Sequence, residues 1–243
     1  MPSWVLVLLV AAVAGTAQTV AGFGFALLAV PLFVTFLGVV DAVALGALLG
    51  IVNAGLVARA AFRHVPWPTV RLLLFGSFCG MPLGLLVLFG VSADTLRLVV
   101  ACVSVAMTIA LLAGFSLPAA GRLGTWAVGV VSGILSTSTG INGPPVVLLL
   151  QALGYSPTVF RGALSTFFVT NGVVSLGMLA FSGVIGRRVL GQALLALPVL
   201  FAANWLGHRL LPHFSTAAFR HLVLGLLVLS ALTSLLDALW HAL

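Results

Sequence analysis

The sequence predicts an all-α, polytopic membrane protein with six full membrane spans and two further helical elements that are broken or form hairpins. Composition supports this class, because 62% of the 243 residues are hydrophobic and only 5% are charged. Soluble domains carry about 25% charged residues, so we place the chain in the lipid bilayer. The same composition excludes nucleic acid as the partner of the net charge of +7.

Six apolar runs have the length of about 20 residues that a helix needs to cross the hydrocarbon core. These runs are Ala42–Ala61, Thr69–Val91, Leu96–Phe115, Gly162–Phe181, Val189–Leu206 and Phe219–Leu239. Most of the ten arginines and three aspartates lie near the ends of apolar runs, which is where topology signals are found. We therefore expect a multi-pass membrane protein.

Two further apolar elements, Trp4–Gly38 and Trp126–Leu153, are interrupted, the first at Gly22-Phe23-Gly24 and the second by glycine and proline. The second interruption reads GILSTSTGINGPP, from Gly133 to Pro145. Glycine loosens a helix and proline removes a backbone donor, whereas Pro144 suits the first position of a new helix. Each element could be one broken crossing, a re-entrant hairpin, or two short tilted helices.

The two interrupted elements resemble each other, which predicts two homologous repeats, residues 1–120 and 121–243. The equivalent pairs, each 118 positions apart, are Gly15 and Gly133, Gly22 and Gly140, and Asn53 and Asn171. The repeats are inverted if each interrupted element returns to its own side or crosses twice, and parallel if it crosses once. If the arginine-rich loop at 59–71 lies inside, the inverted arrangement puts seven arginines inside and three outside. The parallel arrangement puts six arginines inside and four outside. The positive-inside rule therefore favours inversion by one residue.

The two interruptions form the candidate substrate site. A helix that starts at mid-membrane has unpaired N–H groups and a positive dipole end, which together bind anions. Discontinuous helices in corresponding positions of two repeats indicate the binding site of a transporter. The candidate residues are Gln18, Thr19, Gly22, Phe23, Gly24, Phe25, Asn53, Ser136, Thr137, Ser138, Thr139, Gly140, Asn142, Gly143 and Asn171.

The alternative for these residues is helix packing. Serine and threonine hydroxyls bond to carbonyls one turn back, and small residues allow helices to approach closely. We interpret any single hydroxyl residue as a packing residue. We interpret the whole duplicated cluster as part of a substrate site. We assign packing to the glycines Gly76, Gly80 and Gly84, which share one helix face, and also to Gly46 and Gly50.

The segments AGTAQTVAGFGFALLAVP and SGILSTSTGINGPPVVLL, spaced across a duplicated membrane protein, resemble the TauE/SafE sulfite exporter family, also known as the toluene-sulfonate uptake permeases. The resemblance covers nearly the whole chain. It implies a transporter, expected to be an exporter, of small sulfur-containing anions such as sulfite or organosulfonates. It also implies that the protein lies in the bacterial inner membrane. The sequence leaves the anion, the direction of transport and the oligomeric state open.

Two other function classes were weighed: an intramembrane serine hydrolase using Ser136 or Ser138, and a non-transporting membrane subunit. A serine nucleophile needs a general base within hydrogen-bond reach, and we expect no histidine at membrane depth. We therefore expect neither an enzyme nor a bound metal or cofactor, and the duplicated interruptions argue against the subunit. Asp41 and Asp94 fall at span boundaries, so no carboxylate is available for proton coupling. We expect an electrogenic uniporter.

Overall fold

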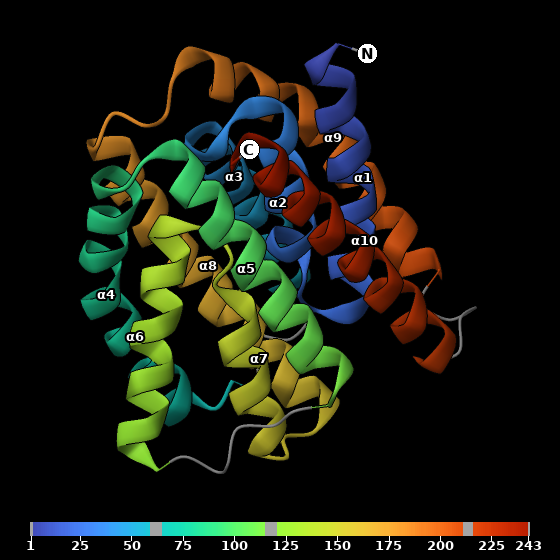
Figure 1. Ribbon diagram of the computed structural model, residues 1–243. Helices are drawn as coiled ribbons and strands as arrows, with labels where there is room; N and C mark the ends of the chain where they lie inside the picture. The colour runs from blue at the N-terminus through green and yellow to red at the C-terminus, as the bar shows by residue number, and fades with distance from the viewer. Residues whose placement is uncertain (1, 59–64, 115–120, 211–215, 243) are drawn as a thin grey trace.

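The computed structural model describes residues 2–58, 65–114, 121–210 and 216–242, and these residues form helices without any strand among them (Figure 1). The helices are α1 (Ser3–Ala21), α2 (Phe25–Leu37), α3 (Val39–Ala58), α4 (Trp67–Gly90), α5 (Ala93–Leu112), α6 (Arg122–Ser138), α7 (Gly143–Ala152), α8 (Pro157–Phe181), α9 (Arg187–Leu210) and α10 (Thr216–Ala242). The all-α prediction is confirmed for the described residues.

Six described helices are long and apolar enough to cross a membrane: Ser3–Ala21, Val39–Val57, Trp67–Gly90, Ala93–Leu112, Pro157–Phe181 and Arg187–Arg209. Five of them correspond to predicted spans. The sixth is α1, the first part of the predicted interrupted element Trp4–Gly38, which runs for 19 residues and ends just before Gly22. The predicted span Phe219–Leu239 lies in α10, whose apolar stretch among the described residues is the shorter Gly225–Trp240.

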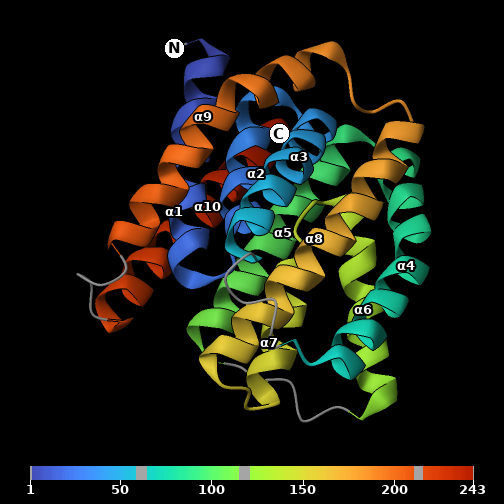
Figure 2. The same cartoon turned by 180° about the vertical axis from the view of Figure 1, so that it is seen from behind.

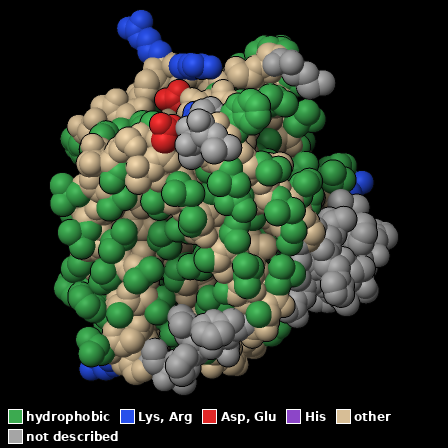
Figure 3. Space-filling model, in the orientation of Figure 1, with side chains coloured by type: hydrophobic (Ala, Val, Ile, Leu, Met, Phe, Trp, Pro, Cys, Tyr) green, Lys and Arg blue, Asp and Glu red, His purple; other side chains and the backbone are tan. Residues whose placement is uncertain are grey.

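The surface of the bundle is suited to lipid. On the face drawn in Figure 3, hydrophobic side chains cover the middle, and arginine atoms lie at the edges. Large apolar side chains such as Phe75, Leu86 and Leu194 are more than half exposed. Such exposure is costly in water and favourable in a bilayer, so it agrees with a multi-pass membrane protein.

The pairs α1–α2 and α6–α7 enter the bundle from opposite ends. In Figure 1, α1 begins at the upper end and α2 returns toward it, whereas α6 begins at the lower end and α7 returns there. Figure 2 shows the same course from behind. The short connections between the paired helices therefore lie inside the molecule, away from both ends.

Helices α4 and α6 lie side by side in the same direction, in contact through glycines. A Cβ atom on Gly80 of α4 would lie 2.1 Å from the carbonyl oxygen of Val130, and one on Gly133 of α6 would lie 2.0 Å from that of Ser77. Any larger residue would force the two helices apart. The packing role predicted for the α4 glycines is therefore confirmed. This close contact fixes the position of the end of α6, which forms part of the site described next.

Candidate functional site

The connection between α1 and α2 turns on two glycines with positive φ. Gly22 has φ +84° and its N–H donates to the carbonyl oxygen of Gln18 at 2.7 Å, which caps the end of α1. Gly24 has φ +103° and immediately precedes α2. Side chains rarely tolerate this left-handed region, and glycine enters it without a steric penalty. The sequence Gly-Phe-Gly therefore ends one helix and starts the next within three residues.

The start of α2 presents unpaired backbone donors. Its first hydrogen bond runs from the N–H of Leu28 to the carbonyl oxygen of Gly24, at 3.0 Å. The N–H groups of Phe25, Ala26 and Leu27 thus have no acceptor in their own helix, as in the first turn of any α-helix. All three residues line a cavity between the helices. Together with the positive end of the helix dipole, they make this wall attractive to an anion.

The connection between α6 and α7 is built differently. Gly140 has φ +72°, and the carbonyl oxygen of Asn142 accepts a hydrogen bond from the hydroxyl of Ser132 on α6. Pro144 and Pro145 occupy the first turn of α7. Proline has no N–H group, so this helix start offers fewer backbone donors than the start of α2 does.

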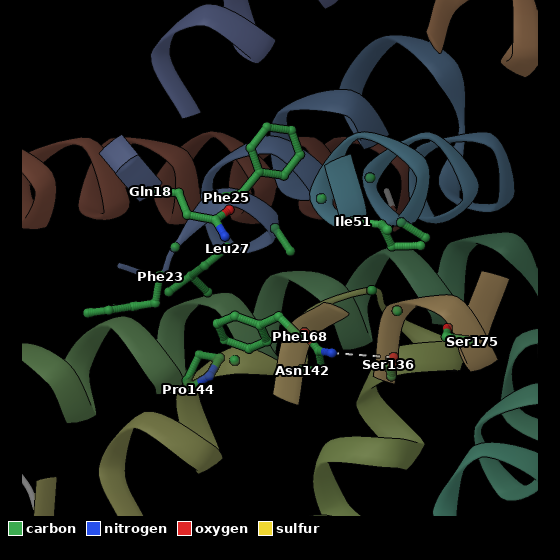
Figure 4. Close-up of a pocket in the computed structure, with 18 residues that line it drawn as sticks. Gln18, Phe23, Phe25, Leu27, Ile51, Ser136, Asn142, Pro144, Phe168 and Ser175 are labelled. Atoms are coloured by element: carbon green, nitrogen blue, oxygen red, sulfur yellow. Dashed lines mark hydrogen bonds between the residues drawn. The ribbon is translucent and has the colours of Figure 1, made fainter. Parts of the chain in front are cut away.

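The cavity between the two connections has a volume of about 60 Å³, which is room for a few water molecules. Figure 4 shows Gln18, Phe25 and Ile51 on one side of it and Ser136, Asn142 and Phe168 on the other. The cavity is lined by eight of the predicted site residues: Gln18, Phe23, Gly24, Phe25, Ser136, Gly140, Asn142 and Gly143. The structure therefore brings together residues that lie more than a hundred positions apart in the sequence.

None of the described residues that line the cavity is charged. Its polar side chains are Gln18, Ser136, Asn142 and Ser175. The side-chain amide of Gln18 makes no hydrogen bond to any described residue, although Gln18 is only 3% exposed. Because an unpaired buried polar group is unfavourable, this amide is available to a bound solute.

A hydrogen-bond network sets the orientation of Ser136. Its Oγ accepts a bond from Nδ2 of Asn171 at 2.8 Å and a longer one from Nδ2 of Asn142 at 3.5 Å. Asn171 is itself held by the hydroxyl of Ser77, which donates to its Oδ1. A serine hydroxyl has two acceptor positions and one donor. With both acceptor positions used, the Ser136 hydroxyl hydrogen has no acceptor among the described residues.

The other seven predicted residues lie outside the cavity lining: Thr19, Gly22, Asn53, Thr137, Ser138, Thr139 and Asn171. Thr137 donates to the carbonyl oxygen of Met81 at 2.7 Å and so ties α6 to α4. Ser138 and Thr139 donate to carbonyl oxygens one turn back, at 2.7 and 3.0 Å. These bonds are the ones that the packing alternative predicts for hydroxyls in membrane helices.

The two asparagines of the spans have different surroundings. Asn171 belongs to the network around Ser136, whereas Asn53 donates through Nδ2 to the carbonyl oxygen of Gly15 at 3.4 Å. Its Oδ1 is buried without a partner among the described residues. Thr19 resembles Asn53 in its surroundings, because it donates to the Gly15 carbonyl and accepts from Asn204, both at 2.9 Å. Equal spacing in the sequence thus does not give equal contacts.

The sequence interpretation missed several residues at the site, including Ala26 and Leu27 at the start of α2. Ser175 lines the cavity, is 1% exposed, and its Oγ has no hydrogen-bond partner among the described residues. It lies four residues after Asn171, on the same helix face, and that spacing is a signal that could have found it. Phe168 also lines the cavity. Arg161 donates through Nη2 to the carbonyl oxygen of Val20 and packs over Gly22.

Comparison with known proteins gives one family and one curated relative. Residues 7–234 match the family described as Sulfite exporter TauE/SafE. The curated relative is the "Probable sulfite/organosulfonate exporter TauE" of Cupriavidus necator. It is 28% identical over 219 residues, which cover 87% of this chain and 85% of the relative. No solved structure gives a significant match.

Proposed function

The chain belongs to the TauE/SafE sulfite exporter family, and on that premise we propose that it exports a small sulfur-containing anion, such as sulfite or an organosulfonate, across the bacterial inner membrane. The family is one of transporters, so the chain is not an enzyme. The curated relative is described as exporting sulfite or organosulfonates, and the substrate class is taken from it. The observation that carries the proposal is a cavity lined by hydrogen-bond donors between two helix starts.

Neutral donors are suited to carrying an anion through a membrane. A buried arginine would bind an anion strongly and would itself be costly to place at membrane depth. Here the donors are backbone N–H groups at the start of α2 and the side chains of Gln18, Ser136 and Ser175. Transport requires binding that is favourable enough for entry and weak enough for release. An uncharged set of donors meets both requirements.

We place the oxyanion nearer to α2 than to α7. The three residues of the first turn of α2 line the cavity and have N–H groups without an acceptor in their own helix, whereas Pro144 and Pro145 have no N–H group. On the α7 side, Ser136 and Asn142 supply side-chain donors instead. The aromatic rings of Phe23 and Phe168, which also line the cavity, would contact the non-oxygen part of the solute. The small volume favours sulfite and short sulfonates over bulky aromatic ones.

Transport by the purified chain tests the proposal. Liposomes that contain the protein and are loaded with sulfite should release it faster than protein-free liposomes, and the release should saturate with concentration. Gly140→Leu is the inactive control: leucine is strained at φ +72°, and its Cβ would lie 3.3 Å from Val30. Release no faster than from protein-free liposomes, or equal release of acetate, would contradict the assignment.

We also propose that the two repeats, residues 1–120 and 121–243, are inverted. The opposite entry of α1–α2 and α6–α7 in Figure 1 supports this arrangement, and so does the arginine distribution in the sequence. Single cysteines at Pro68 and Gly186, in a background with Cys79 and Cys102 replaced, should then react with a membrane-impermeant reagent from opposite sides. If both positions react only from the cytoplasmic side, the repeats are parallel.

A further inference from the structure

A second concave site lies at the lower end of the bundle in Figure 1, where α4 and α6 begin and α7 ends. It is an open groove of about 550 Å³, and we call it the lower groove. Its polar lining includes Arg71, Arg122 and Thr69, and its apolar lining includes Phe75 and Leu153. It shares no lining residue with the cavity between the helix connections.

The charge of the lower groove is positive and uncompensated. Arg71 and Arg122 are both exposed, and neither forms an ion pair in the described part of the chain. The three aspartates, Asp41, Asp94 and Asp237, lie in α3, α5 and α10, and none of them lines the groove. The positive dipole ends of α4 and α6 add to the field of the arginines. The groove is therefore complementary to an anion.

Aromatic residues place the lower groove at the depth of lipid headgroups. The guanidinium of Arg71 lies 5.7 Å from the ring centroid of Trp67, which is 40% exposed. The hydroxyl of Tyr155 is 2.8 Å from Oγ1 of Thr69, a lining residue. Tryptophan and tyrosine are enriched where the hydrocarbon core meets the headgroups. Phe75 is 62% exposed and lies further along α4, where it extends the apolar wall of the groove.

We propose that the lower groove binds an anionic phospholipid. The phosphate headgroup lies between Arg71 and Arg122, and an acyl chain follows Leu72 and Phe75 along α4. A free anion would contact the arginines alone, whereas a phospholipid would contact both the arginines and the apolar wall formed by Leu72 and Phe75. Basic pockets between membrane helices are the sites where anionic headgroups bind. This assignment does not depend on the identity of the transported anion.

Lipid retention by the purified full-length chain tests the assignment. The protein in detergent is titrated with phosphatidylglycerol or phosphatidylcholine, and bound lipid is measured by native mass spectrometry. We expect selective binding of phosphatidylglycerol, and a loss of affinity of about thirtyfold in the R71Q/R122Q variant, the amount expected for two arginines at an anionic surface. The matched control is R187Q/R188Q, which removes two exposed arginines from the start of α9 and should bind as wild type does.

Three outcomes would overturn the assignment: equal affinity of R71Q/R122Q and wild type, equal retention of the two lipids, or displacement of phosphatidylglycerol by millimolar inorganic phosphate. The last outcome would indicate a site for free anions. If R71Q/R122Q does not fold, Arg122→Gln alone replaces it, because Arg122 is exposed at the first position of α6. For that single variant we expect a loss of about fivefold.

Discussion

Replacing Ser136 by alanine is expected to weaken the apparent affinity for the exported anion about ten- to a hundredfold. The Ser136 hydroxyl lines the cavity, and its two acceptor positions are taken by Asn171 and Asn142. We therefore expect its hydrogen to be donated to the anion. A hydrogen bond to a charged group is worth about 1.5–3 kcal/mol, and each tenfold change in affinity corresponds to about 1.4 kcal/mol. The measurement is the concentration dependence of efflux from proteoliposomes.

Ser138→Ala is the matched control, since it makes the same chemical change two residues away on α6. Ser138 bonds only to the carbonyl oxygen of Ile134 in the described structure and does not line the cavity, so near-normal export is expected. Ser175→Ala should lower affinity as Ser136→Ala does, because its hydroxyl is buried and unpartnered. Equal losses in Ser136→Ala and Ser138→Ala would show that the serines act through packing.

The positions of the long helices could be predicted from hydropathy, but the first residues of α8 and α9 could not. The predicted run Gly162–Phe181 begins five residues after α8 does, and the run Val189–Leu206 begins two residues after α9. In both cases the helix includes arginines, Arg161 in α8 and two more at the start of α9. A prediction based on hydropathy leaves arginines out of a membrane span. In the folded protein, long basic side chains at helix ends reach the membrane–water interface while their backbone stays helical.

The turns of the site could be recognised from local sequence, and the cavity could not. Gly22, Gly24 and Gly140 adopt positive φ, a conformation for which glycine is the expected residue. The cavity depends on how α8 and α3 pack against these turns. Phe168 and Ser175 enter it from a helix whose side-chain direction is set by tertiary contacts. Likewise, nothing in the sequence indicates that Asn171 is held by Ser77 of α4 while Asn53 bonds to Gly15.

The membrane potential is expected to drive export without a proton gradient. Proton-coupled carriers hold a titrating side chain at membrane depth, and none of the described residues that line the cavity is Asp, Glu or His. An anion leaving a cell that is negative inside gains about 2.3 kcal/mol per charge for each 100 mV. At about 1.4 kcal/mol per tenfold, this energy supports nearly fiftyfold accumulation outside. The chain therefore needs no coupling residue to act as an exporter.

A short alkyl sulfonate is the best probe of this mechanism, because sulfonates stay ionised throughout the working pH range and cannot carry protons themselves. In proteoliposomes, a potassium-diffusion potential should change the size of the sulfonate flux, and reversal of the potential should reverse its direction. A pH gradient alone should leave the flux unchanged. A flux that ignores voltage and stops when the pH gradient is collapsed would reject uniport. In that case the proton would have to bind at a group outside this cavity, since the polar side chains of its described lining residues are amides and hydroxyls.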